Sequence, residues 1–310
     1  MEALVEWAWK RAAVLVKVVV HWWTGRSELE RICDGRVVHS ARMSLRFSSS
    51  VWKSKQLRLW RKLIFHHRPF SIAGARDYIT AAKKIKATDA AYTVANVTLC
   101  LKDLRMLNVM ISRLEQNAAA AFDPKKEAHL KLLEKLWVSA FPGQRYPGPT
   151  GEAWGSLGFQ GLDPATDFRG MGLLGLNQLV VLAAKDQSNF QRLLRLSAGP
   201  PAYFPLAATS INLTKLALEL LKENRLHGVL FTALSDQTLS LSGQPTEDGE
   251  DEGKWAEMLE TRFHALFCSL WSEFGELWSR RAPKSIMEFP AIFAEFKAAQ
   301  NARYPVLSAV

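Results

Sequence analysis

Beyond residue 77, apolar residues recur at three- and four-residue steps, and this spacing predicts a succession of α-helices. No segment alternates apolar and polar residues as a half-buried strand would, and no internal repeat is evident. We therefore expect an all-α fold: a compact multi-helix domain preceded by an amphipathic N-terminal helix and a basic helical region. The expected helices cover residues 77–86, 90–117, 125–141, 171–184, 187–196, 203–224, 254–279 and 286–300.

Two segments interrupt this pattern. Residues 142–149 are rich in proline and glycine and cannot form a helix. Residues 242–254 carry five acidic side chains among glycine and proline, which predicts an exposed, disordered acidic loop. The sequence then predicts an N-terminal helix over 1–25, a basic helical region over 26–124 that packs on the main domain, and that domain over 125–302.

The first 23 residues combine valine, alanine and tryptophan with a few charges. Lys10, Arg11 and Lys17 interrupt any membrane-spanning run, and no small-residue cleavage site of a signal peptide follows. On a helical wheel the charged residues fall in one sector, and only Arg11 lies outside it. A wide apolar face with tryptophan at its edges favours a helix in a membrane interface. The alternative is a helix docked on the protein's own core.

Charge strengthens the membrane interpretation. Residues 1–90 contain 18 Lys and Arg but only 7 Asp and Glu, whereas the remainder is nearly balanced. Such a basic region implies an anionic partner, and we expect a lipid surface rather than nucleic acid, because no nucleic-acid motif accompanies it. A solvated helix face remains the alternative for any single lysine. The three cysteines form no C-x-x-C pair, so we expect reduced, mostly buried thiols and no metal site.

The stretch from Trp154 to Leu176 is dense in glycine and contains helix-start signals at Asp163-Pro164 and Thr166-Asp167. Its three glycines at 170, 172 and 175 formally match a G-x-G-x-x-G phosphate loop. No hydrophobic strand precedes them, so we interpret them as positions that let a helix pack tightly on a neighbour. Spacing alone supports no nucleophile elbow, P-loop or catalytic triad, so we do not expect a self-contained enzyme.

This stretch resembles the core motif of the ELMO (engulfment and cell motility) domain family, in particular its ELMO-domain-only branch. The family pattern is Trp-x3-Gly-Phe-Gln, then Asp-Pro-x-Thr-Asp-Phe-Arg-Gly, then Gly-x-Leu-Gly-Leu. The matching residues are Trp154, Gly158, Phe159, Gln160, Asp163, Pro164, Thr166, Asp167, Phe168, Arg169, Gly170, and Gly172 with Gly175 in the segment ending at Leu176. Shorter likenesses at 24–33, 129–137, 211–214 and 286–289 extend the resemblance over most of the chain. It is weakest over 36–125 and 242–254.

The resemblance implies GTPase-activating activity toward Arf and Arf-like small GTPases, with Arg169 as the catalytic arginine supplied in trans. Such an arginine neutralises charge that develops on the β- and γ-phosphoryl oxygens. We expect Gln160, Asp163, Thr166, Asp167, Gly158 and Gly170 to support the loop or the GTPase interface, and Trp154, Phe159, Phe168, Gly172 and Gly175 to be structural. From the residues alone, a structural ion pair between Asp167 and Arg169 is the alternative.

The protein would then be a regulator of an enzyme, without a cofactor of its own, because GTP and Mg²⁺ belong to the partner GTPase. We expect a cytoplasmic protein held peripherally on an organelle membrane such as endoplasmic reticulum, mitochondria or Golgi. The competing function is a non-catalytic ELMO-type adaptor that binds a small GTPase or an exchange-factor partner at a membrane. The retained Arg169 and the short chain favour the activator.

Overall fold

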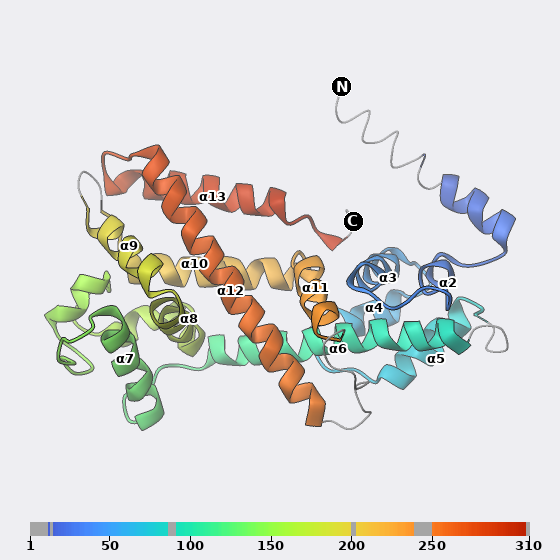
Figure 1. The fold of residues 1–310 in the computed structure, drawn as a ribbon, viewed down its shortest axis with the longest axis horizontal. Coiled ribbons are helices and arrows are strands. Elements are labelled where there is room, and N and C mark those ends of the chain that lie inside the picture. The colour runs from blue at the N-terminus through green and yellow to red at the C-terminus, as the bar shows by residue number, and fades with distance from the viewer. Residues whose placement is uncertain (1–11, 13–14, 86–90, 200–202, 239–249, 308–310) are drawn as a thin grey trace. The chain divides into compact units, whose positions relative to one another are not determined.

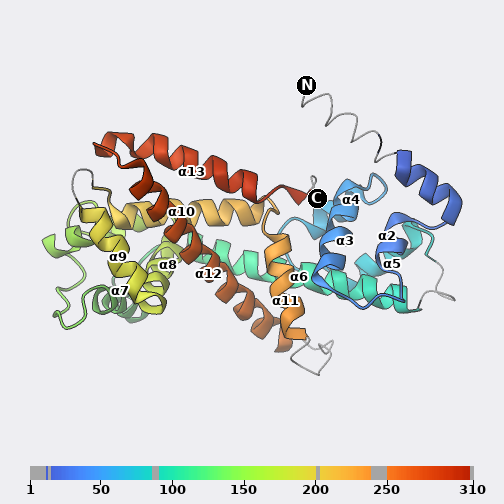
Figure 2. The same cartoon turned by 45° about the horizontal axis from the view of Figure 1, so that its top comes forward.

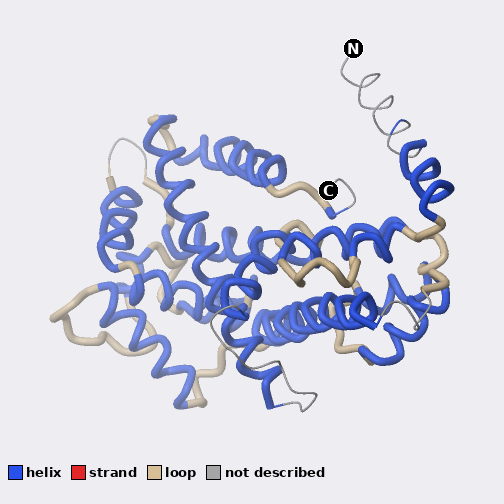
Figure 3. The backbone as a smooth tube through the Cα atoms, turned by 45° about the vertical axis from the view of Figure 1, so that its right-hand side comes forward, coloured by secondary structure: helices blue, strands red, loops and turns tan. Residues whose placement is uncertain are grey.

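The fold is all-helical, as the sequence predicts. The computed structural model describes residues 12, 15–85, 91–199, 203–238 and 250–307, and every regular element within these ranges is a helix (Figure 3). The chain divides into two compact units, which we describe separately. Unit 1 comprises residues 1–109, 227–252 and 307–310, and unit 2 comprises residues 110–226 and 253–306. The domain boundaries expected from the sequence, at 25, 124 and 302, stay predictions.

Unit 1 is a small helical assembly built around α3. Its elements are residues 15–24, α2 (Glu28–Ile32), α3 (Ala41–Lys53), α4 (Arg58–Ile64), α5 (Ile72–Ala82), the first part of α6 (Ala91–Ala119), and α11 (His227–Thr238). Helix α3 packs against α2 and against α11, which lies beside it although about 180 residues separate them in the chain (Figure 2). Its buried face includes Met43, Phe47 and Val51, so these three side chains anchor the unit.

Unit 2 surrounds the apolar helix α8 (Gly172–Lys185). Helix α8 packs against α7 (Glu127–Ala140), α9 (Gln187–Ala198) and α10 (Leu206–Lys222), as Figure 1 shows. Nine of its fourteen residues are buried, which is the expected composition of a helix covered on most sides. The remaining elements are the rest of α6 from residue 110, the 3₁₀ turns η1 (Glu152–Leu157) and η2 (Pro164–Gly170), α12 (Glu250–Arg281) from residue 253, the 3₁₀ turn η3 (Ile286–Glu288) and α13 (Phe289–Arg303).

An aromatic core joins α12 to its neighbours in unit 2. The ring centroid of Phe204, just before α10, lies 5.0 Å from that of Trp278 and 5.7 Å from that of Phe274. Phe296 of α13 approaches Phe274 edge-on at 5.5 Å. These edge-to-face contacts are the preferred aromatic geometry, so the rings stabilise the arrangement of α10, α12 and α13 around one another.

Some helix boundaries differ from those expected. Helix α5 spans Ile72–Ala82 and not the predicted 77–86. It starts at Ile72 because the Ser71 hydroxyl accepts a hydrogen bond from the Gly74 N–H and caps the helix there. Residues 250–254, predicted as part of the acidic disordered loop, form the start of α12, while residues 242–249 lie outside the described residues. Ser285 caps η3 through the Met287 N–H rather than a long helix over 286–300.

The N-terminal helix is described only from residue 12 and residues 15–24, so its predicted first part lies outside the described residues. Within 15–24 the apolar side chains point into solvent: Leu15, Val16, Val18 and Val19 are each at least 60 % exposed. The alternative of a helix docked on the protein's own core is therefore not observed for these residues. No helix in the described ranges combines the length and apolarity needed to cross a bilayer.

Candidate functional site

The glycine-rich motif folds into two consecutive 3₁₀ turns that lead into α8. The second turn, η2, begins at Asp163, whose carboxylate accepts a hydrogen bond from the Ala165 N–H at 2.9 Å. Pro164 follows at the first helical position, where its missing N–H costs nothing. The Thr166 hydroxyl donates to the Asp163 carbonyl at 2.8 Å. Local capping by Asp163 therefore starts η2, as the Asp163-Pro164 signal predicts, whereas Thr166-Asp167 lies inside η2 and starts no helix.

A hydrogen bond between the two halves of the loop fixes its curvature. The backbone N–H of Gln160 donates to Oδ2 of Asp167 at 2.7 Å, across seven residues. Asp167 is half-buried, and this burial raises the pKa of its carboxyl group; the Gln160 hydrogen bond acts in the opposite direction, and nearby Asp163 adds to the rise. Asp167 thus serves the loop, while the Gln160 side chain stays exposed and contributes through its backbone.

Arg169 projects from η2 into solvent. Its side chain is exposed, and it has no hydrogen-bond or ion-pair partner within the described residues. The structural alternative, an ion pair between Asp167 and Arg169, does not form, because Asp167 is directed to the Gln160 N–H. The neighbouring residue Phe168 is 1 % exposed, so the backbone on one side of Arg169 is anchored in the core. A free guanidinium on a fixed backbone is the arrangement that a trans-acting arginine requires.

A buried aromatic cluster forms the floor beneath this loop. The ring centroids of Phe168 and Phe159 are 5.5 Å apart, and those of Phe159 and Trp154 are 5.6 Å apart. The Trp154 ring lies 5.2 Å, between centroids, from the ring of Trp137 in α7. The Trp154 indole N–H donates to the Gly148 carbonyl at 3.1 Å and so attaches the preceding Pro/Gly segment. Trp154, Phe159 and Phe168 are each buried, in keeping with the structural role expected of them.

Two glycines of the motif permit close backbone contacts that no other residue would. Gly158 has φ +77°, and a Cβ there would lie 2.4 Å from the Leu206 backbone N at the start of α10. Gly172 has φ +50°, and a Cβ there would lie 2.5 Å from the carbonyl oxygens of Ala118 and Ala120 at the end of α6. The Leu173 N–H donates to that Ala120 carbonyl at 2.9 Å. Gly172 is therefore a packing position, as interpreted from the sequence for the glycines at 170, 172 and 175, and Gly158 is a further one.

The remaining motif residues divide between surface and packing positions. Thr166 and Gly170 are exposed, and Asp163 is half-buried as the cap of η2. A Cβ on Gly170 would lie 3.1 Å from Cγ2 of Ile211, so η2 lies directly against α10; Gly175 faces the same isoleucine at 3.6 Å. Gly158 packs against the start of α10, and the supporting or interface role expected of it stays a prediction.

One surface residue of the loop was not identified from the sequence. Leu162 is 58 % exposed although it stands between two turns that are otherwise polar or buried. Its carbonyl accepts a hydrogen bond from the Gly151 N–H at 2.7 Å, so its backbone is fixed while its side chain faces solvent. The only sequence signal is an isolated leucine in a polar, glycine-rich stretch, and such a leucine is more often buried.

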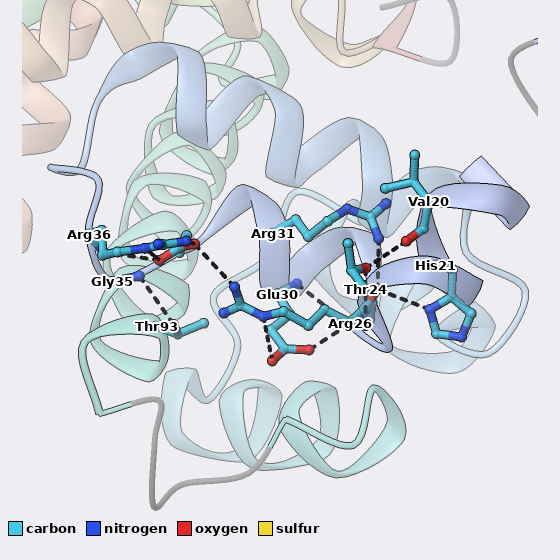
Figure 4. A network of polar contacts seen from close by, with 11 residues as sticks. Val20, His21, Thr24, Arg26, Glu30, Arg31, Gly35, Arg36 and Thr93 are labelled. Atoms are coloured by element: carbon cyan, nitrogen blue, oxygen red, sulfur yellow. Dashed lines mark hydrogen bonds and ion pairs between the residues drawn. The ribbon is translucent and has the colours of Figure 1, made fainter. Parts of the chain in front are cut away.

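A second candidate surface lies at the N-terminal helix of unit 1. Trp22 and Trp23 are 85 % and 83 % exposed, which is far above the usual exposure of tryptophan. A polar network fixes the end of this helix (Figure 4): the Thr24 hydroxyl donates to the Val20 carbonyl at 2.6 Å, and the Arg31 guanidinium donates to the Arg26 carbonyl at 2.7 Å. Arg26 also pairs with Glu30 at 3.1 Å. The two tryptophans therefore extend from an anchored base.

Metal and thiol chemistry adds no competing site in the described part of the chain. In the ranges that the structure describes, no three His, Cys, Asp or Glu side chains meet as metal ligands. The three cysteines are unpaired, with Cys33 and Cys100 buried and Cys268 half-buried. The exposed arginine loop and the tryptophan-bearing helix are thus the surfaces that carry functional features among the described residues.

The structure thus defines a class of protein: an all-helical domain with a glycine-rich loop that presents an exposed arginine. A model of the ELMO/CED-12 family matches residues 112–293, which is more than half of the chain, and the chain belongs to this family. It is 30 % identical over 290 residues to ELMO domain-containing protein B of Dictyostelium discoideum, covering 93 % of this chain and 94 % of that protein.

Human and mouse relatives match over a similar extent. Human ELMO domain-containing protein 2 is 30 % identical over 275 residues, covering 88 % of this chain and 85 % of that protein. ELMO domain-containing protein 1 of Mus musculus is 28 % identical over 299 residues, covering 91 % and 85 %. These long matches include unit 1, so the basic N-terminal region is a shared part of such proteins rather than an unrelated extension.

Proposed function

We propose that this protein is a GTPase-activating protein for an Arf-family or Arf-like small GTPase, and that it supplies Arg169 in trans. Membership of the ELMO/CED-12 family supports the activity, as the resemblance of the motif implies. The observation that carries the proposal is the state of Arg169: an exposed guanidinium without a partner in the described residues, on a backbone held by the Asp167–Gln160 hydrogen bond.

The chemistry divides between two proteins. The GTPase holds GTP and Mg²⁺ and orients the attacking water. Arg169 would donate hydrogen bonds to the phosphoryl oxygens on which charge develops, and a residue held on a rigid loop loses little entropy when it does so. Arginine fingers accelerate GTP hydrolysis by about 10³- to 10⁵-fold, or about 4–7 kcal/mol. Lysine is a poor substitute because its ammonium group is a point charge without a planar fork.

Single-turnover hydrolysis of GTP by a panel of purified Arf and Arf-like GTPases tests this proposal. We expect the wild type to accelerate at least one panel member, and Arg169→Lys to lower the saturating rate by about 100-fold or more. The matched control is Arg262→Lys, another exposed arginine of unit 2, which should leave the rate unchanged. Circular dichroism establishes that each variant is folded.

The other results contradict the proposal in distinct ways. Acceleration that survives Arg169→Lys would assign the catalytic group to another residue. Binding to a GTP-loaded panel member without any acceleration would instead favour the adaptor function, because an adaptor needs the interface but no catalytic arginine.

The second part of the proposal is peripheral attachment to an anionic organelle membrane through residues 1–23 and the basic region. The exposed Trp22 and Trp23 support this part, because tryptophan is enriched at membrane–water interfaces. The exposed cations of α3 and α4, among them Arg42, Arg46 and Lys62, supply charge that attracts anionic headgroups. Attachment would concentrate the activator where membrane-bound GTPases are located.

A further inference from the structure

The loop that carries Arg169 is too small to form a specific protein interface alone. Stable interfaces bury about 800 Å² on each partner, with roughly 20–30 residues. The exposed residues of η2 and the preceding turn are only a few, so a GTPase that receives Arg169 must also contact the neighbouring surface. The structure shows two neighbouring features that could extend the interface. One is the exposed Leu162 within the loop, and the other is the part of α10 next to η2.

Exposed residues of α10 lie next to the point where η2 touches this helix. Ile211, half-buried, contacts Gly170, the residue directly after Arg169. Asn212 and Lys215 are the exposed residues that follow on this side of α10, and Lys215 lies one turn beyond Ile211 on the same face. The stripe formed by Ile211, Asn212 and Lys215, here called the α10 stripe, therefore continues the arginine loop.

Lys215 differs from Lys222, the other cation of α10, and from Lys297 of the neighbouring α13. Lys222 is paired with Glu115 at 2.6 Å, and Lys297 of α13 is paired with the α10 residue Glu219 at 2.7 Å. Lys215 has no ion-pair or hydrogen-bond partner in the described residues. Lys215 is thus an exposed cation without a partner in the described residues, one helical turn from the isoleucine that Gly170 contacts, and it is available to an anionic partner surface.

Leu162 supplies the apolar contact that such an interface needs. Its backbone is held by the Gly151 hydrogen bond, and it directly precedes the cap residue Asp163. Leucine loses less side-chain entropy on binding than the long polar side chains do, and burial of its exposed side chain removes apolar surface from water.

We propose that Leu162 and the α10 stripe form the docking surface for the GTPase, with Lys215 facing an acidic patch of that partner. This inference rests on the proposed function and names which residues, other than Arg169, bind the GTPase. Docking residues differ from the finger in their kinetic effect: they set the concentration of activator needed for half-maximal acceleration, whereas Arg169 sets the saturating rate.

The test measures single-turnover hydrolysis by the panel GTPase that the wild type accelerates most, across a range of full-length activator concentrations. We expect Lys215→Glu to raise the half-saturating concentration by about tenfold, with less effect at high salt, and Leu162→Ala to raise it several-fold. Neither variant should change the saturating rate. The matched control is Lys254→Glu, the same charge reversal on an exposed lysine near the start of α12.

The outcomes separate the two proposals. If the wild type accelerates no panel member, the proposed function and this inference fall together. If the wild type accelerates a GTPase but Lys215→Glu and Leu162→Ala both leave the half-saturating concentration unchanged, the inference alone is wrong. If Lys254→Glu raised the half-saturating concentration as much as Lys215→Glu does, the inference would also be wrong, because the effect would then come from the net charge of the protein.

Discussion

The carboxylate of Asp167 accepts a hydrogen bond from the backbone N–H of Gln160 at 2.7 Å and forms no ion pair with Arg169 two residues later. The residues alone leave an ion pair between Asp167 and Arg169 open, and the structure shows Asp167 hydrogen-bonded within the loop instead. Asp167 closes the loop on itself, and Arg169 is left without a partner among the described residues. We infer that the acidic residue of the Asp-Phe-Arg motif is a positioning residue, which would act on the arginine through the backbone.

The first prediction concerns this hydrogen bond. Asp167→Ala removes the acceptor, so the loop should sample other conformations and stimulated GTP hydrolysis should fall by about 10- to 100-fold, because a small misplacement of a catalytic group is costly. Asp167→Asn keeps a side-chain oxygen that can accept from the Gln160 N–H, and it should retain most of the activity. The measurement is the saturating single-turnover rate. An equal loss in both variants would mean that the carboxylate charge itself is required.

The second prediction concerns Gly158, where positive φ and a close contact coincide. Gly158→Ala should lower the free energy of unfolding by about 3 kcal/mol or more, because a Cβ would meet the Leu206 backbone. Gly161 provides a matched control: it has φ +83°, but no atom lies within 4 Å of the position that a Cβ would occupy there. Gly161→Ala should therefore cost only about 1 kcal/mol, the strain of the left-handed backbone.

Urea unfolding of the two variants measures this difference. Because both glycines have the same sign of φ, the difference between them isolates the steric contact with α10. Equal losses would show that backbone strain alone accounts for the requirement at Gly158.

The sequence predicts the all-α fold and most helices of unit 2, since their apolar residues follow the helical period. It is less informative over α3, where serine occupies the buried face. Ser44 and Ser48 are fully buried, and the Ser48 hydroxyl forms a hydrogen bond by donating to the Ser44 carbonyl at 2.7 Å. Small polar residues whose hydroxyl groups are hydrogen-bonded to the helix backbone can be buried, and they interrupt the apolar period. The sequence of α3 therefore shows little periodicity.

The sequence does not predict helix α11, because the apolar run in this helix is continuous and not interrupted. Its residues 229–234 are nearly all apolar, and a continuous apolar run has no period that would separate a helix from a buried strand. At the candidate site, the motif identifies Arg169, but its exposure follows from where Asp167 is directed. The direction of the Asp167 side chain depends on a hydrogen bond to a residue seven positions away, which no local sequence pattern specifies.

The third prediction concerns pH and the buried cluster of His39, Asp103, Ser44 and Cys100 in unit 1. Burial lowers the pKa of His39, but its contact with Asp103 at 3.2 Å, together with Cys100, outweighs burial and raises the pKa to about 10. The Ser44 hydroxyl donates to the same Asp103 carboxylate at 2.5 Å. Burial raises the pKa of the Cys100 thiol well above its usual value, with Cys33 adding to the rise and His39 opposing it.

The sign of the pH effect follows from this raised pKa. The stabilisation by protonated His39 is complete below the unfolded pKa of 6.5 and is lost as the pH rises toward about 10. The free energy of unfolding should therefore fall over this range in the wild type, and His39→Gln should reduce the slope. The control is His264→Gln, since burial, with nearby Lys185, lowers the pKa of His264 to about 4 and keeps it neutral throughout. Identical slopes in wild type and His39→Gln would refute the prediction.

The fourth prediction concerns the N-terminal tryptophans. Trp22 and Trp23 both have more than four fifths of their surface exposed, and each ring offers a large apolar area to a lipid interface. Replacement of both by serine should lower the partition of the full-length protein onto vesicles of phosphatidylcholine and phosphatidylserine by about tenfold or more. Tyr92→Ser is the matched control, because Tyr92 is 77 % exposed on α6 and is not part of this helix.

Vesicle composition separates the apolar contribution from the charge. Cosedimentation with vesicles that lack phosphatidylserine removes the attraction of the basic residues but leaves the insertion of the two rings. We expect wild-type binding to weaken on neutral vesicles and to weaken further in the double variant. Unchanged binding of the double variant to both kinds of vesicle would mean that the exposed rings do not contact lipid. Unchanged GTPase activation by the double variant in solution, with lost activation on vesicles, would assign the helix to attachment and leave Arg169 as the catalytic group.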